Sequence, residues 1–184
     1  MALMGPSGAG KTTLLNALAG MAPYAETSAD MVLLKGMPFK KDHLGYVPQF
    51  DCINPVFTVY ETLELAARLR SKQSEEALKA AVEDLLATVG LLDVKDVRAA
   101  KLAGGQLKLV SIAIGLVSRP KVLFLDEPTT GLDSTAAEAV VSAVKDIAST
   151  GKIVYVHFGL DSGHVFFMRC ARRLASPSVV FVAC

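Results

Sequence analysis

The stretch Gly5–Thr13, which reads GPSGAGKTT, limits most strongly what this chain can fold into. It fits the phosphate-binding pattern G-x-x-x-x-G-K-[ST]. Glycines let such a loop curl until its backbone N–H groups point at phosphate oxygens, while Lys11 adds a positive charge and the Thr12 hydroxyl is suited to ligate Mg²⁺. Apolar residues before the loop and a predicted helix after it favour phosphate binding over an ordinary glycine-rich turn. The residues expected to bind nucleotide here are Gly5, Pro6, Ser7, Gly8, Ala9, Gly10, Lys11, Thr12 and Thr13.

Composition narrows the class of protein further. The 184 residues carry a net charge of +1, so there is no general basic field and no nucleic-acid partner is expected. A hydrophobic content of 52% suits buried parallel strands. Residues 1–4 lead directly into the loop, so no signal peptide is expected, and no apolar run is long enough to span a membrane. The three cysteines are widely spaced and favour a reducing, cytoplasmic setting over disulfides or a metal site.

Two carboxylates form the second candidate site. Asp126 and Glu127 directly follow the apolar stretch 122–125, which is predicted to be a buried strand, and Pro128 prevents a helix from starting there. Ligands of α/β sheets bind at the carboxyl ends of the strands. These carboxylates could instead only cap the following loop, but the phosphate loop in the same chain favours catalysis.

The remaining pattern alternates strands and helices. Thr58 and Glu61 form a capping box at the start of one helix, and Ser134 is the expected N-cap of another. Further helices and strands are expected at 11–20, 74–89, 104–117 and 31–34, 44–47, 153–156. Gln49 and His157 each follow a predicted strand, where they could face a nucleotide or be ordinary structural residues. The apolar but interrupted stretch after Gly163 receives no role.

Taken in order, these motifs resemble the nucleotide-binding domain of an ATP-binding-cassette (ABC) transporter. The Gly5–Thr13 loop is similar to the family's Walker A motif, Leu102–Gln106 to its signature, and Val122–Glu127 to its Walker B motif. Gln49, Asp133 and His157 resemble the Q-loop, D-loop and switch residues. The segments GPSGAGKTTLLN, FTVYETL and DEPTTGLDS are similar to those of the G (White and pleiotropic-drug-resistance) subfamily.

The resemblance implies an α/β fold of the P-loop NTPase type, with a mainly parallel sheet flanked by helices. It assigns residues 1–160 to an ABC-type ATP-binding domain, with a helical subdomain at about 55–118, and leaves 161–184 as an unassigned tail. It also implies a head-to-tail dimer of two nucleotide-binding domains. These would act on a membrane domain that is absent from this chain, so the domain would be cytoplasmic and membrane-associated through that partner.

The roles implied by the resemblance are specific. Thr12, Gln49 and Asp126 would hold Mg²⁺, Glu127 would polarise the attacking water and His157 would contact the γ-phosphate of ATP. The residues expected to contact the nucleotide of the partner domain are Ala103, Gly104, Gly105, Gln106 and Asp133.

Some positions depart from the family pattern. Ala103 stands where the family normally has Ser, Lys108 is the one basic residue left just after the signature, and Phe158-Gly159 replaces Gln-Pro after the switch His. The strands that normally precede Walker A are missing from the sequence. Three alternatives therefore stay open: a non-catalytic ABC fragment, a soluble ABC ATPase acting on ribosomes or DNA, and, least favoured, a simple nucleotide kinase.

Overall fold

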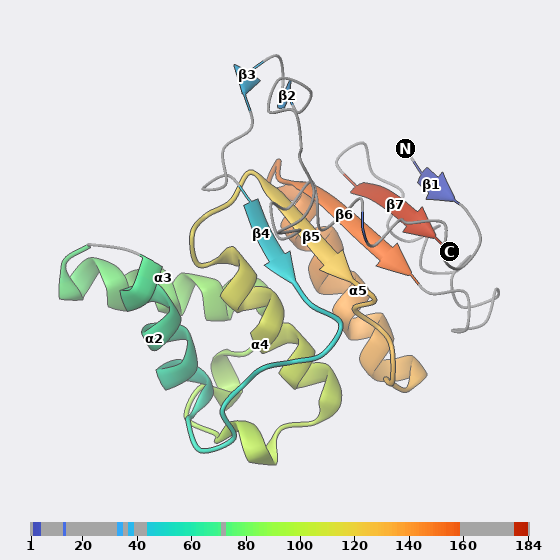
Figure 1. The fold of residues 1–184 in the computed structure, drawn as a ribbon. Helices are drawn as coiled ribbons and strands as arrows, with labels where there is room; N and C mark the ends of the chain where they lie inside the picture. The colour runs from blue at the N-terminus through green and yellow to red at the C-terminus, as the bar shows by residue number, and fades with distance from the viewer. Residues whose placement is uncertain are drawn as a thin grey trace.

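The computed structural model describes residues 2–4, 13, 33–34, 37–38, 44–70, 73–158 and 179–183. The expected phosphate loop from Gly5 to Thr12, the helix predicted after it and most of the tail lie outside these residues. Within the described residues, helices lie against a sheet (Figure 1).

The sheet has five strands in the order β1-β7-β6-β5-β4, and every neighbouring pair is parallel. The strands are β1 Ala2–Met4, β4 Leu44–Val47, β5 Val122–Asp126, β6 Ile153–Phe158 and β7 Val179–Ala183. A separate antiparallel pair joins β2 Leu33–Leu34 to β3 Met37–Pro38. The predicted parallel α/β sheet is confirmed.

β5 is buried on both faces, as expected for a central parallel strand. Leu123 and Leu125 are at most 1% exposed and join the main core with α4 and α5, while Val122 and Phe124 pack in a second cluster. In that cluster the Phe124 ring stacks on Tyr155 of β6 at 4.8 Å. Apolar side chains on both faces hold β5 in the middle of the sheet and direct its end toward Asp126.

Four α-helices and two short 3₁₀ turns complete the described fold: α2 Val59–Arg70, α3 Glu75–Val89, α4 Gly104–Leu116, α5 Ser134–Ser149, η3 Leu92–Val94 and η4 Ala99–Lys101. The predicted capping box precedes α2, since Thr58 N–H donates to Glu61 and Glu61 N–H donates to Thr58 Oγ1. One cap differs from the prediction. Asp133, not Ser134, caps α5, because its Oδ1 accepts the N–H of Ala136 at 2.8 Å.

α4 is the helix around which the helical part packs. It is apolar on nearly all sides and contacts α2, α3, α5 and β4, which explains why a helix of this composition is stable here. Gly45 of β4 allows the closest approach, because a Cβ there would lie 2.3 Å from the carbonyl oxygen of Gly115. In Figure 1, α2 and α3 stand to one side of the sheet, with α4 between them and the strands.

Three strands differ from expectation, and the first is β3, where the sequence analysis expected no strand. His157 was expected to end β6, but the strand continues to Phe158 because both residues pair with β7. The tail received no role from its sequence, yet β7 lies between β6 and β1 and joins them into one sheet. No helix in the described part of the chain is long and apolar enough to cross a membrane.

Candidate functional site

Asp126 lies at the carboxyl edge of the sheet, between neighbouring strands on both sides. Tyr46 of β4 donates its hydroxyl to Asp126 Oδ2 at 3.2 Å, and Asp126 is in register with His157 of β6. Burial, followed by the charge of Asp126 and this hydrogen bond, raises the pKa of Tyr46 to about 12. Tyr46 thus stays protonated and donates to Asp126, a contact that sequence reasoning missed.

Glu127 follows with an unusual backbone. Its φ is +44°, a region that residues with a side chain rarely adopt and that is concentrated at functional sites. Gln49 Nε2 donates to Glu127 Oε2 at 2.8 Å, and Thr130 Oγ1 donates to the same oxygen at 2.9 Å. The fold therefore brings together Gln49 and Glu127, which sequence analysis had singled out separately. Thr130 was missed, although its place three residues after Glu127 in a turn was a usable signal.

The start of α4 carries the second group of predicted residues. Ala103 is the N-cap, and its N–H donates to Gln106 Oε1 at 3.1 Å. This is half of a capping box, because an alanine side chain has no oxygen to accept the N–H of Gln106. The first turn of α4 also presents the positive end of a helix, which suits an anion.

Gly104 and Gly105 let the start of α4 approach the start of α5. A Cβ on Gly105 would lie 2.9 Å from Ala136 Cβ, and one on Gly104 would lie 3.2 Å from Leu132 Cδ2. Asp133 caps α5 at this same junction. The predicted signature and D-loop residues are thus neighbours, and the two glycines have a packing reason as well as the expected ligand role.

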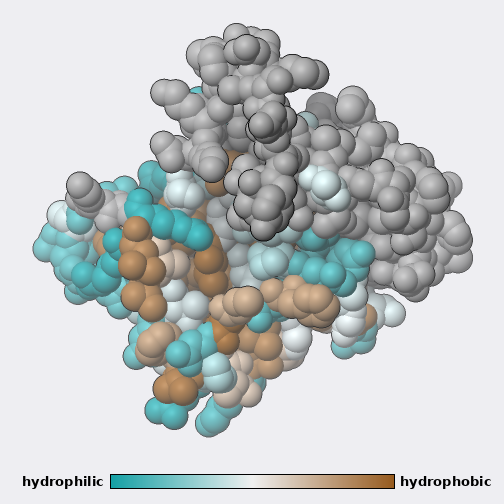
Figure 2. Space-filling model, viewed as in Figure 1, coloured by the Kyte–Doolittle hydropathy of each residue, from teal (hydrophilic) through white to brown (hydrophobic). Residues whose placement is uncertain are grey.

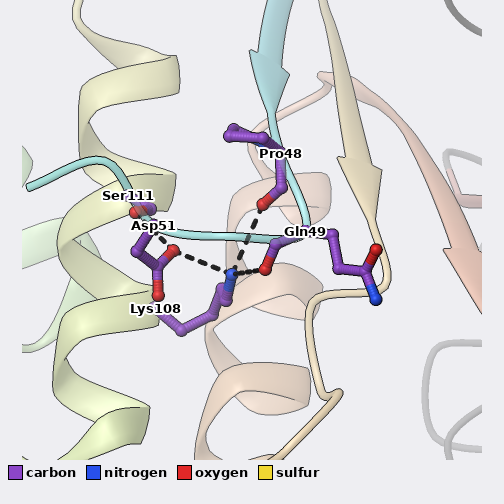
Figure 3. A network of polar contacts seen from close by, with 5 residues as sticks. All are labelled: Pro48, Gln49, Asp51, Lys108 and Ser111. Carbon is purple, nitrogen blue, oxygen red and sulfur yellow. Dashed lines mark hydrogen bonds and ion pairs between the residues drawn. The ribbon is translucent and has the colours of Figure 1, made fainter.

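A buried lysine connects α4 to the segment that follows β4 (Figure 3). Lys108 is 3% exposed, and its ammonium group lies 2.8 Å from both the carbonyl oxygen of Gln49 and Asp51 Oδ1. Sequence analysis noted Lys108 only as the remaining basic residue after the signature. The acceptors of Lys108 could not be predicted from the sequence, because they lie 57 to 60 residues earlier in the chain.

The oxygen groups near Asp126 could supply some, but not all, of the ligands that a hard cation such as Mg²⁺ needs. Asp126, Glu127 and the amide oxygen of Gln49 are oxygen groups of the kind that Mg²⁺ accepts, and Mg²⁺ commonly takes one or two carboxylates together with phosphates and water. No cluster of three or more His, Cys, Asp or Glu side chains suited to a metal occurs among the described residues. This donor set suits an ion that is shared with a phosphate ligand rather than an all-protein metal site.

Other predicted residues are placed less fully. Gly5, Pro6, Ser7, Gly8, Ala9, Gly10, Lys11 and Thr12 lie outside the described residues. Thr13 is exposed and has helical backbone. His157 is located by its strand register with Asp126 of β5 and Val182 of β7.

An apolar groove lies away from these carboxylates. Its volume is about 270 Å³, and it runs between α2 and the segment that follows β4. Leu65 and Leu69 on α2 are 45% and 78% exposed. The lining residues are Cys52, Ile53, Asn54, Phe57, Thr62, Leu65, Ala66, Leu69, Arg70 and Ile114. Figure 2 shows brown, apolar surface gathered over this helical part of the molecule.

A family model and individual relatives both relate this chain to ABC transporters. The family model described as "ABC transporter" matches residues 1–130. ABC transporter G family member STR of Petunia hybrida is 42% identical over 165 residues, which is 84% of this chain and 20% of that protein. ABC transporter G family member 17 of Arabidopsis thaliana is 39% identical over 98% of this chain and 29% of its own length. The chain therefore spans between a fifth and three tenths of these relatives.

A solved structure shares the fold. The cbiO1 protein of Clostridium perfringens, described as part of the ABC transporter complex cbiONQ, superposes with a TM-score of 0.66 at 25% identity. The match covers 99% of this chain and 65% of that one.

Proposed function

The chain belongs to the ABC transporter family, and we propose that it is a nucleotide-binding domain that binds and hydrolyses ATP to power export across a membrane. The observation that carries this proposal is the contact between Gln49 and Glu127 beside Asp126 at the carboxyl edge of a parallel sheet. That edge is where α/β sheets bind their ligands. A simple nucleotide kinase would leave the signature-like start of α4 unexplained.

Within this proposal the residues divide the chemistry of phosphoryl transfer. Lys11 and the backbone of the Gly5–Thr13 loop bind the phosphates of ATP, and Thr12, Gln49 and Asp126 hold Mg²⁺. When bound, Mg²⁺ neutralises charge on the phosphates. Glu127 accepts the proton of the attacking water and orients it, while Thr130 and Gln49 limit the directions in which its carboxylate can turn. His157 contacts the γ-phosphate.

The start of α4 serves a second nucleotide in a head-to-tail dimer. Ala103, Gly104, Gly105 and Gln106 present the helix N-terminus to the nucleotide held by the partner domain, and Asp133 lies beside them on α5. The junction of α4 and α5 holds these groups together, which supports a shared role.

The apolar groove is the proposed docking surface for the membrane domain. The matched relatives are named as transporters and are several times longer than this chain, so they contain segments beyond the part that matches it. A partner helix with an apolar face would bury Leu65 and Leu69, which otherwise expose apolar surface to water.

Glu127→Gln tests the catalytic role. The variant keeps its shape and the contact with Gln49, so binding of a fluorescent ATP analogue should stay within about twofold of wild type. Turnover, measured as phosphate release with Mg²⁺ present, should fall at least about 100-fold because the general base is lost. Glu76→Gln, which changes an exposed carboxylate on α3, is the matched control. Loss of analogue binding in Glu127→Gln would assign Glu127 a structural role, and an inactive wild type that binds ATP would favour the non-catalytic reading.

A further inference from the structure

Lys108 has an environment that a lysine rarely occupies. The residue is 3% exposed, and burying a cation is strongly unfavourable unless acceptors surround it. Its ammonium group has such acceptors: the Gln49 carbonyl oxygen and Asp51 Oδ1 at 2.8 Å each, and the Pro48 carbonyl oxygen at 3.4 Å. Figure 3 shows the side chain reaching from α4 into the bend of the segment after β4.

Asp51 adds a second attachment to the same helix. Its Oδ1 accepts the Ser111 hydroxyl at 2.6 Å as well as the Lys108 ammonium. Lys108 and Ser111 are three residues apart and therefore share one face of α4. The segment Pro48–Asp51 is thus held by backbone carbonyls and by a side chain. We refer to Lys108, Ser111 and Asp51 as the α4 clamp.

Gln49 is the residue through which the clamp reaches the carboxylates. Its carbonyl oxygen accepts from Lys108, and its side-chain amide donates to Glu127 Oε2 at 2.8 Å. The same residue therefore makes the contact with α4 and the contact with the proposed catalytic base. A shift of α4 along its axis would move the backbone of Gln49 and with it the amide.

We propose that Lys108 is a positioning residue that holds Gln49 against Glu127 and links this carboxylate to the N-terminal end of α4. The inference rests on the proposed function, in which the Ala103–Gln106 end of α4 faces the nucleotide of the partner domain. Lys108 touches neither nucleotide. The clamp would make the geometry around Glu127 in one site depend on the placement of a helix that serves the other site.

An ion pair between a buried lysine and a half-buried carboxylate can also be a purely structural contact, and the two roles predict different results. Replacing both partners of a buried pair by neutral groups of similar shape often leaves stability nearly unchanged. The double variant Lys108→Met with Asp51→Asn therefore removes the ion pair of the clamp while keeping the core filled. If the contact is only structural, this variant should match wild type in stability, exchange and turnover. If Lys108 positions Gln49, turnover of the variant should be low even though the protein is folded.

The experiment compares the full chain with this double variant by urea unfolding, by hydrogen–deuterium exchange of residues 49–57 and by steady-state ATP hydrolysis. We expect a folded double variant in which exchange of 49–57 is at least about tenfold faster and kcat about tenfold lower. KM for ATP should change less than about twofold, because the phosphate loop is untouched. Lys145→Met, at an exposed position on α5, should match wild type in all three measurements.

Ser111→Ala provides the milder second variant, because it removes one donor to Asp51 and leaves Lys108 in place. Exchange of 49–57 should rise about threefold and kcat should fall in proportion. Unchanged exchange in a folded double variant, or in Ser111→Ala if the double variant does not fold, would overturn the positioning role. So would faster exchange with an unchanged kcat. A wild-type chain without ATPase activity would count against the proposed function, while exchange would still decide whether the clamp holds Gln49.

Discussion

Glu127 and Asp126 are adjacent in sequence but are held by different means. Asp126 ends a buried strand and accepts from Tyr46, so its position follows from the sheet. Glu127 has a φ of +44° and is held by Gln49 and Thr130, so its position follows from a strained turn. Backbone strain of this kind persists where surrounding contacts over-determine it. The position of the Asp126 carboxylate is therefore set by the sheet, whereas the direction of the Glu127 carboxylate is set by its contacts with Gln49 and Thr130.

Tyr46 should make stability depend on pH in the alkaline range. Its pKa of about 12 in the fold lies above the ordinary value of 10.0, so the folded state keeps a proton that the unfolded state loses. The stabilisation is fully present below pH 10 and is lost as the pH rises toward 12. Urea unfolding from pH 9 to 11.5 should show a steeper decline for wild type than for Tyr46→Phe. Parallel curves would show that the Tyr46 hydroxyl titrates normally.

Ala103→Ser should act in two separable ways. A serine at this N-cap can accept the N–H of Gln106 and complete the capping box, which stabilises proteins by about 1 kcal/mol. Its hydroxyl can also donate to a phosphate, and one such charge-assisted hydrogen bond is worth about 1.5–3 kcal/mol, or about ten- to a hundredfold in turnover. Thermal unfolding and ATPase rates measure the two effects, with Ala100→Ser on η4 as control. A stabilised variant with unchanged turnover would show that the hydroxyl has no role in hydrolysis.

At the scale of elements, the contact between β4 and α4 sets the position of Gln49, which lies just after the strand. Gly45 and Gly115 allow the strand to pass close to the C-terminal half of the helix, and the α4 clamp then holds the segment that follows. Helix and strand are therefore joined at two places, one apolar and one ionic. Together these contacts direct the chain from β4 toward Glu127.

Gly45→Ala should be strongly destabilising. The added Cβ would lie 2.3 Å from the Gly115 carbonyl oxygen, which is backbone and cannot move aside cheaply. Overpacking of this kind costs about 1–3 kcal/mol or more, so we expect a loss of about 3 kcal/mol in urea unfolding. Gly90→Ala is the matched control, because it has open space but a φ of +72° and should cost about 1–2 kcal/mol. A smaller loss for Gly45→Ala than for Gly90→Ala would mean that this contact is not tightly packed.

At the scale of the whole molecule, the sheet joins segments from both ends of the chain. β7 pairs with β6 on one side and with β1 on the other, and β1 leads directly into the Gly5–Thr13 stretch. A strand near residue 180 thereby connects the strand before the expected phosphate loop to the strands that carry Asp126 and His157.

Val182→Pro tests this connection. Val182 is in register with both Leu3 and His157, and proline in an interior strand removes a ladder hydrogen bond. An unsatisfied backbone partner costs about 1–3 kcal/mol, so Val182→Pro should be less stable than Val182→Ala by about that amount. Urea unfolding of both variants makes the comparison. Equal stability would place residue 182 outside the interior of the sheet.

Local chemistry made much of the fold predictable from the sequence. The capping box of Thr58 and Glu61 forms as expected, because its donors and acceptors are three residues apart. The helix expected at 74–89 likewise forms as α3, with Ser74 as its N-cap. The strand that ends at Asp126 was predictable because continuous apolar residues suit a strand buried on both faces. Each of these features depends on groups that are close neighbours along the chain.

Only the tertiary structure decided which distant groups meet. Gln49 reaches Glu127 across 78 residues and Lys108 reaches Gln49 across 59, because strand order and the packing of α4 bring these segments together. Periodicity cannot encode such pairs, since a buried lysine and an apolar neighbour occupy the same helix face. β7 was missed for the same reason: a short apolar stretch becomes a strand when two other strands lie beside it and satisfy its backbone hydrogen bonds.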